Sequence, residues 1–204
     1  MFGDFSLIGI VVLIISVLVS MAVHEFMHAF VGYKLGDTTA KEEGRLSLNP
    51  LRHIDPLMTL ALPVISLLVF HTPILAAKPV PFNPARIKYD EYGSALLAIA
   101  GPVSNLALAV VGAFVSHAFV PGSLLGQSLD LFVYLNVSLF VFNLVPIPPL
   151  DGSRVLYAFA PDPVRRVMEM IEPFGIFIVF GLILIGGFGS ILLQINHMVL
   201  NFLP

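Results

Sequence analysis

The stretch His24-Glu25-Phe26-Met27-His28 lies inside an apolar segment that begins near Phe5. Residues four positions apart share one face of a helix, so the imidazoles of His24 and His28 can converge on a single metal ion. Glu25 points to one side of that pair and cannot easily be a third ligand, but its carboxylate can reach a water bound to the ion. Two histidines, a carboxylate and an open fourth position form a hydrolytic zinc site. The stretch therefore predicts a helix that carries one zinc ion per chain.

The composition is that of an integral membrane protein. Of the 204 residues, 57% are hydrophobic and 11% are charged, and the mean hydropathy is +0.95. We expect a single domain over residues 1–204 with the lipid bilayer as its surroundings. No basic cluster is large enough for nucleic-acid binding, and the lack of cysteine excludes disulfides and thiolate zinc ligands. Ionisable side chains at membrane depth are costly, so those near His24 are functional candidates.

The apolar segments predict a multi-pass protein of the cell membrane. Four segments are long enough to cross, namely 5–35, 92–120, 129–145 and 174–199. A fifth, 57–77, is short and interrupted by proline, and it either crosses or re-enters. If it re-enters, all ten lysines and arginines fall on one side of the membrane. The positive-inside rule favours this arrangement, with four crossings, the N-terminus outside and the zinc site toward the cytoplasm; a protein with five crossings is the alternative.

Two polar segments suggest further elements. Residues 38–40 and 45–48 are short extended candidates around a polar turn, and they predict a small β-hairpin. Residues 163–172 alternate apolar and charged side chains, which fits either an amphipathic surface helix or an ordinary connecting helix. The predicted fold class is thus an all-α polytopic helical bundle with a small β-hairpin and a re-entrant loop. We also hypothesise that the 45–48 strand offers an edge to which an unwound substrate segment adds.

Asp151 is the best candidate for the third zinc ligand. It ends the stretch Asn143-Leu144-Val145-Pro146-Ile147-Pro148-Pro149-Leu150-Asp151-Gly152, which directly follows an apolar span. The prolines stop the helix, and backbone freed in this way is tolerated at membrane depth only in protein or beside a cavity. The glycine after the aspartate allows close approach, and the topology brings Asp151 to the same membrane side as His24. Alternatively, Asp151 only caps the next helix.

Two asparagines are further candidates for the catalytic site. Asn105 belongs to a helical seam of small residues, so it either bonds across helices as a packing residue or contacts the substrate or an oxyanion. Asn143 precedes the proline break and shares a face with Asn136. Asn143 can either polarise the scissile carbonyl or support Asp151.

Three motifs in this order give the chain a family resemblance. They are His24-Glu25-Phe26-Met27-His28, Gly101-Pro102-Val103-Ser104-Asn105, and the stretch from Asn143 to Gly152. Together they resemble the site-2 protease family of intramembrane zinc metalloproteases, and Gly44–Pro50 and Ala77–Pro84 look like its compact prokaryotic branch. The resemblance covers nearly the whole chain, but it includes no preceding span and no PDZ or CBS domain.

The resemblance implies specific roles. His24, His28 and Asp151 would bind zinc, Glu25 would be the general base, and membrane-anchored protein substrates would be cleaved near the cytoplasmic face. The chief alternative is a metal-ion transporter or another metal-binding membrane protein, since ionisable residues at depth also mark ion paths. A third, a catalytically inactive scaffold, is disfavoured by the intact Glu25.

Overall fold

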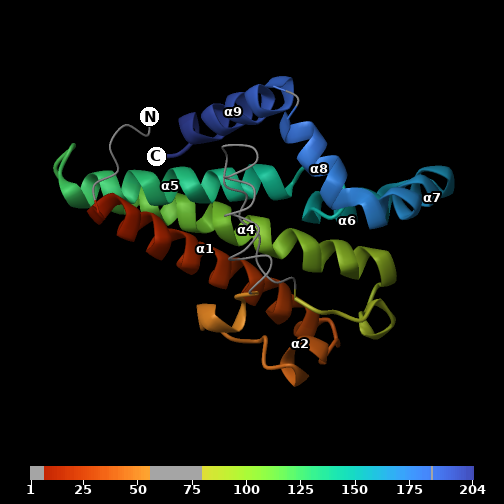
Figure 1. Ribbon diagram of the computed structural model, residues 1–204. Helices are drawn as coiled ribbons and strands as arrows, with labels where there is room; N and C mark the ends of the chain where they lie inside the picture. The colour runs from red at the N-terminus through yellow and green to blue at the C-terminus, as the bar shows by residue number, and fades with distance from the viewer. Residues whose placement is uncertain (1–6, 56–79, 185) are drawn as a thin grey trace.

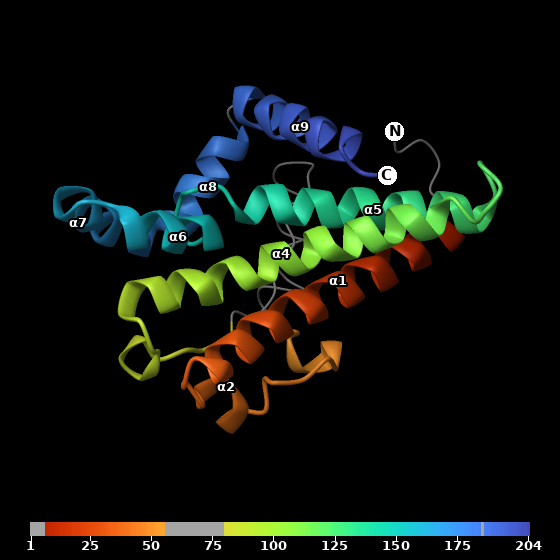
Figure 2. The same cartoon turned by 180° about the vertical axis from the view of Figure 1, so that it is seen from behind.

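The computed structural model describes residues 7–55, 80–184 and 186–204, and every regular element within these ranges is a helix (Figure 1). Three long helices, α1, α4 and α5, lie side by side in both opposite views (Figure 2), and each of them contacts the other two. Shorter helices surround them. In chain order the elements are α1 (Leu7–Lys34), α2 (Thr39–Glu42), η1 (Pro50–Arg52), η3 (Pro84–Arg86), α4 (Asp90–Ser116), α5 (Leu124–Asn143), α6 (Asp151–Phe159), α7 (Asp162–Ile171), η4 (Glu172–Phe174), α8 (Gly175–Leu184) and α9 (Gly186–Asn201).

Four helical stretches in the described residues are long and apolar enough to cross a membrane. They are Leu7–Lys34, Asp90–Ser116, Leu124–Asn143 and Asp162–Leu184. The first three lie close to predicted spans. The fourth differs, because the predicted span 174–199 is divided between α8 and α9, and α9 lies alongside α5. Glycines 186 and 187 open α9, and glycine disfavours an uninterrupted helix. The segment 57–77, predicted to re-enter, lies outside the described residues.

The β-hairpin prediction is wrong. Residues Thr39–Glu42 form α2, and no strand occurs in the described part of the chain. The carboxylate of Asp37 accepts hydrogen bonds from the backbone N–H of Thr39 (3.0 Å) and from its hydroxyl (2.5 Å), which starts a helical turn in place of a strand. The N–H of Arg45 then bonds back to the Ala40 carbonyl, at 2.7 Å. The 45–48 segment is therefore no sheet edge, and strand addition there has no structural basis.

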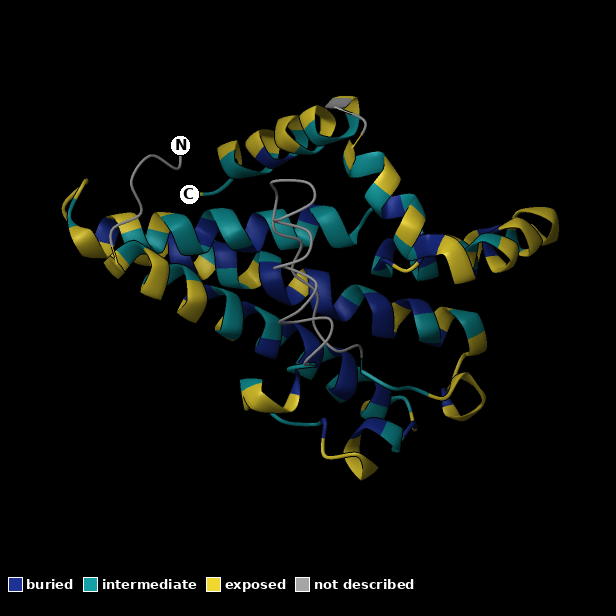
Figure 3. Ribbon diagram, in the orientation of Figure 1, coloured by how far each residue is buried: buried dark blue, intermediate teal, exposed yellow. Residues whose placement is uncertain are grey.

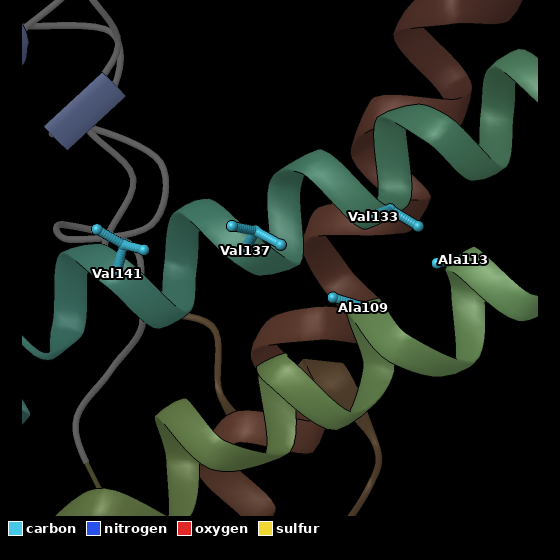
Figure 4. Close-up of a cluster of buried hydrophobic side chains, with 5 residues drawn as sticks. All are labelled: Ala109, Ala113, Val133, Val137 and Val141. Carbon is cyan, nitrogen blue, oxygen red and sulfur yellow. The ribbon is translucent and has the colours of Figure 1, made fainter. Parts of the chain in front are cut away.

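The bundle core is built by small residues on α4 that face branched residues on α5. Figure 4 shows the cluster, which consists of Ala109, Ala113, Val133, Val137 and Val141. Small side chains let the two backbones approach closely, and such approach is the main source of helix association in lipid. Most of the seam predicted around Asn105 is buried here: Ala98, Gly101, Asn105, Ala109 and Gly112.

The half of α1 nearest the N-terminus carries most of the exposed residues of this helix, and most of its buried residues lie in the other half. Leu7, Ile14 and Ile15 are exposed, whereas His24, Glu25 and His28 are buried. Figure 3 shows that buried residues gather where α1 and α4 meet. A helix of 28 residues is about 42 Å long, which exceeds the roughly 30 Å hydrocarbon layer, so an apolar, lipid-facing first half can precede a protein-enclosed second half.

The break between α5 and α6 places Asp151 beside the bundle. α5 ends at Asn143, and α6 begins at Asp151 itself. A Cβ at Gly152 would lie 2.2 Å from the carbonyl oxygen of Leu144 and 2.7 Å from that of Val145. Only glycine therefore allows the first turn of α6 to pack this tightly against the end of α5.

Candidate metal centre

The side chains of His24, His28 and Asp151 converge at one point. Asp151 Oδ2 lies 3.2 Å from His24 Nε2 and 3.4 Å from His28 Nε2. The two Nε2 atoms are 3.0 Å apart, and the rings meet edge to face with an interplanar angle of 82°. The His24 and His28 side chains are 10% and 7% exposed, and that of Asp151 is 22% exposed. The cluster is thus enclosed by helices, and Asp151 is its most accessible member.

The other ring nitrogens set the orientation of both imidazoles. His28 Nδ1 lies 2.8 Å from the backbone carbonyl of Leu97, which can only accept a hydrogen bond. His24 Nδ1 lies 2.6 Å from Oδ1 of Asn105, which is also an acceptor. Both Nδ1 atoms therefore carry the proton in the neutral rings, and both Nε2 lone pairs face Asp151. An outer hydrogen bond of this kind is usual for metal-ligating histidines.

These donor atoms suit a divalent cation. Two Nε2 lone pairs and a carboxylate oxygen are all acceptors, and they repel one another at these distances unless a positive charge lies between them. Asp151 Oδ2 is buried and has no hydrogen-bond partner. In the described residues, His24, His28 and Asp151 offer ligand atoms that all lie within 4.8 Å of one another. Imidazole nitrogen and carboxylate oxygen are zinc ligands, so this group could hold that ion.

Gly101 provides the surface on which both rings lie. A Cβ built on Gly101 would be 2.3 Å from His28 Nε2 and 2.7 Å from His24 Cε1. α4 therefore presents bare backbone to the imidazoles. The glycine of the second sequence motif thus lets α4 approach the imidazoles of the candidate metal centre.

The remaining predicted residues differ in how they relate to the three candidate ligands. Glu25 is buried on α1 next to His24, but it is not part of the group that could ligate a metal. Asn105 contacts His24 directly. Asn143, in contrast, donates from Nδ2 to the carbonyl of Leu139 at 3.0 Å, which is an ordinary bond within its own helix. The capping alternative for Asp151 does not hold, since Leu150 is the N-cap of α6 and no side chain caps that helix.

One contributor was not predicted from sequence. Asn136 on α5 is fully buried, and its Oδ1 accepts from Asn105 Nδ2 at 3.0 Å. The available signal was a lone amide in the middle of an apolar span, because such a group must find a partner inside the protein. Its partner could not be identified, because the packing of α5 on α4 decides it.

The sequence of this chain is similar to those of known proteins. A protein-family model described as Peptidase family M50 matches residues 122–185, which include Asp151. A Bacillus subtilis (strain 168) protein named "Putative zinc metalloprotease YwhC" is 40% identical over 190 residues, covering 89% of this chain and 83% of that protein. This chain belongs to peptidase family M50, the site-2 protease family.

Two further proteins are similar to this chain at lower identity. Rip2 of Mycolicibacterium smegmatis, which carries the same description, is 29% identical over 187 residues, or 88% of this chain and 69% of that protein. MJ0611 of Methanocaldococcus jannaschii, also described as a "putative zinc metalloprotease", is 32% identical over 158 residues, which cover 76% of this chain and 74% of that protein. No solved structure matches this M50 chain significantly. As an M50 member with helices able to span a bilayer, the protein is a membrane metalloprotease whose cofactor is zinc.

Proposed function

We propose that this protein cleaves peptide bonds in or near the transmembrane segments of membrane-anchored substrates, at a zinc ion held by His24, His28 and Asp151. The observation that carries the proposal is the convergence of three ligand atoms from two helices far apart in the sequence, with Glu25 adjacent to His24. Three protein ligands leave one position for water or substrate, which is the arrangement of a catalytic rather than a structural zinc site.

Each side chain has a defined task in this proposal. Bound zinc would supply a Lewis acid that activates water and polarises the scissile carbonyl. Glu25 takes a proton as the water oxygen attacks the carbonyl carbon, and it delivers that proton to the amine nitrogen as the C–N bond breaks. Asn143 keeps one N–H beyond its bond to Leu139, and this N–H can be directed at the substrate carbonyl. The substrate helix must unwind locally, because a helix pairs its own peptide groups.

The active site faces the cytoplasm in this proposal. Hydrogen bonds hold the two basic segments 34–52 and 83–88 together, since Lys88 N donates to Leu35 O at 2.9 Å and Asn83 N donates to the carboxylate oxygen Oδ2 of Asp37 at 2.7 Å. Arg165 of α7 lies 3.7 Å from Glu91 at the start of α4, which brings a third basic segment to the same end. Basic residues collect on the cytoplasmic side of membrane proteins. The supporting observation for the orientation is that this end of α1 is the one that carries His28.

The test is the substitution Glu25→Gln in the full chain, purified in detergent. Zinc per chain should stay at the wild-type level, and cleavage of membrane-anchored substrates with helix-weakening residues should fall by about 10²–10⁴-fold, as is typical when a general base is lost. The control is Glu43→Gln, which changes an exposed carboxylate and should leave both unchanged. Wild-type cleavage by Glu25→Gln would refute the proposed mechanism. Zinc flux through proteoliposomes without any cleavage would favour a transporter instead.

A further inference from the structure

Two fully buried asparagines connect the metal centre to the rest of the bundle. Asn105 on α4 and Asn136 on α5 are both 0% exposed. Asn136 Nδ2 donates to the Phe132 carbonyl at 2.9 Å, Asn105 Nδ2 donates to Asn136 Oδ1 at 3.0 Å, and Asn105 Oδ1 faces His24 Nδ1 at 2.6 Å. The series therefore runs from α5 through α4 to a predicted ligand on α1.

The direction of every hydrogen bond in this series is fixed by its backbone ends. The Phe132 carbonyl accepts only, so the Asn136 amide nitrogen must face it and Oδ1 must face Asn105. Asn105 Nδ2 also lies 3.3 Å from the carbonyl of Ser20, so turning this amide over would bring oxygen against oxygen at two places. Asn105 Oδ1 consequently points at His24, and His24 must donate from Nδ1. The Nε2 lone pair is then the one that faces Asp151.

We propose that Asn136 and Asn105 are positioning residues that hold the His24 ring in its metal-binding tautomer and orientation. This inference rests on the proposed ligand set. The His28 ring is oriented by a hydrogen bond to the backbone carbonyl of Leu97, and no side-chain substitution removes that carbonyl. His24 is different, because its orientation depends on side chains. Asn105 also bonds to Ser20, one turn before His24, so it holds both the ring and the helix that carries it.

The experiment measures zinc affinity of the full chain in detergent by competition with a chelator. Asn105→Leu keeps a similar volume but cannot accept from His24, and the zinc dissociation constant should rise about 10–100-fold. Asn105→Asp keeps an acceptor for His24 while burying a charge, and it should bind zinc more tightly than Asn105→Leu. A residue that served packing alone would give the opposite order, because leucine packs better than a buried carboxylate.

A matched control separates this role from the general cost of losing a buried amide. Asn196 on α9 is 6% exposed and donates to Ser138 Oγ of α5 at 3.0 Å. Asn196→Leu therefore removes an interhelical amide without touching the His24 series, and its zinc affinity should equal that of the wild type. Asn136→Leu should weaken zinc binding more than Asn196→Leu but less than Asn105→Leu, since Ser20 still orients Asn105. If Asn105→Leu does not fold, the positioning role is tested by whether Asn136→Leu binds zinc more weakly than Asn196→Leu; equal zinc affinities would overturn it.

One reference variant distinguishes failure of this inference from failure of the proposed ligand set. His24→Ala should lose zinc. If it keeps wild-type affinity, the ligand assignment itself is wrong. If His24→Ala loses zinc while Asn105→Leu and Asn136→Leu both keep wild-type affinity, the ligands stand and the positioning role is overturned. The positioning role is also overturned if Asn105→Asp binds zinc no more tightly than Asn105→Leu.

Discussion

Replacing Gly101 with alanine should disrupt the proposed metal centre while α4, the helix that contains Gly101, stays helical. The new Cβ would lie 2.3 Å from His28 Nε2, 2.5 Å from His28 Cε1 and 2.7 Å from His24 Cε1, whereas ordinary van der Waals contact begins near 3.4 Å. Either the rings or the α1 and α4 backbones must therefore move by about 1 Å. Metal–ligand distances tolerate only about 0.2 Å. The required displacement is several times larger than this tolerance.

The expected result is loss of zinc with retention of the folded bundle. We expect the zinc dissociation constant to rise by more than the ~10–100-fold that follows loss of an outer hydrogen bond, because both histidines are displaced. Alanine is favoured over glycine by about 1 kcal/mol in a helix interior, so α4 itself gains helix propensity. The assay is zinc per chain by elemental analysis, followed by chelator competition and a cleavage measurement on the same preparation.

The matched control is Gly181→Ala in α8. It is also a glycine within a helix, and a Cβ there meets nothing within 4 Å. This variant should keep wild-type zinc affinity and activity. Stoichiometric zinc at wild-type affinity in Gly101→Ala would show that the rings do not lie on Gly101, and the geometry described for the metal centre would then be incorrect.

Two further predictions concern Gly152, beside the candidate ligand Asp151, and Asp37, in the polar loop after α1. Gly152→Ala should reduce both zinc content and cleavage, because its Cβ would lie 2.2 Å from the rigid backbone oxygen of Leu144 and would force Asp151 away; zinc per chain tests this, and unchanged content would contradict it. Burial opposes ionisation of Asp37, but hydrogen bonds from Thr39 and Asn83 outweigh it and hold the pKa of Asp37 below its usual value. The unfolded chain therefore binds the proton more readily, so the stability contributed by Asp37 is present above about pH 4 and is lost as the pH falls through the lower pKa of the folded state. Asp37→Asn should lower the free energy of unfolding by about 1–3 kcal/mol at pH 7 and by less at pH 3; thermal unfolding at both values measures this, and an equal loss at both would refute it.

The sequence by itself determined those features that depend on local spacing. His24 and His28 share a face because four residues make about one helical turn, whatever surrounds them. Of the four helical stretches able to cross a membrane within the described residues, three could be located from the sequence, because lipid requires long uninterrupted apolar helices. Asp151 stood out because a proline break and a glycine follow an apolar span. A local signal for α2 is also present in the sequence, since Asp37 and Thr38 precede Glu42 as in a helix start, whereas the neighbouring residues Thr38 and Thr39 are β-branched and favour a strand.

Tertiary structure decided how these local pieces meet. The distance from Asp151 to the two imidazoles depends on how tightly α6 packs on the end of α5, and the contact of Gly101 with both rings depends on the approach of α4 to α1. The bond between Asn105 and Asn136 required the relative rotation of two helices, which no local pattern specifies. Spacing along one helix is set by backbone geometry, whereas distances between helices are set by the packing of every side chain along the interface. For that reason the candidate ligands and Asn105 could be named from the sequence, whereas the contacts through which Asn105, Asn136 and Gly101 orient the ligands could not.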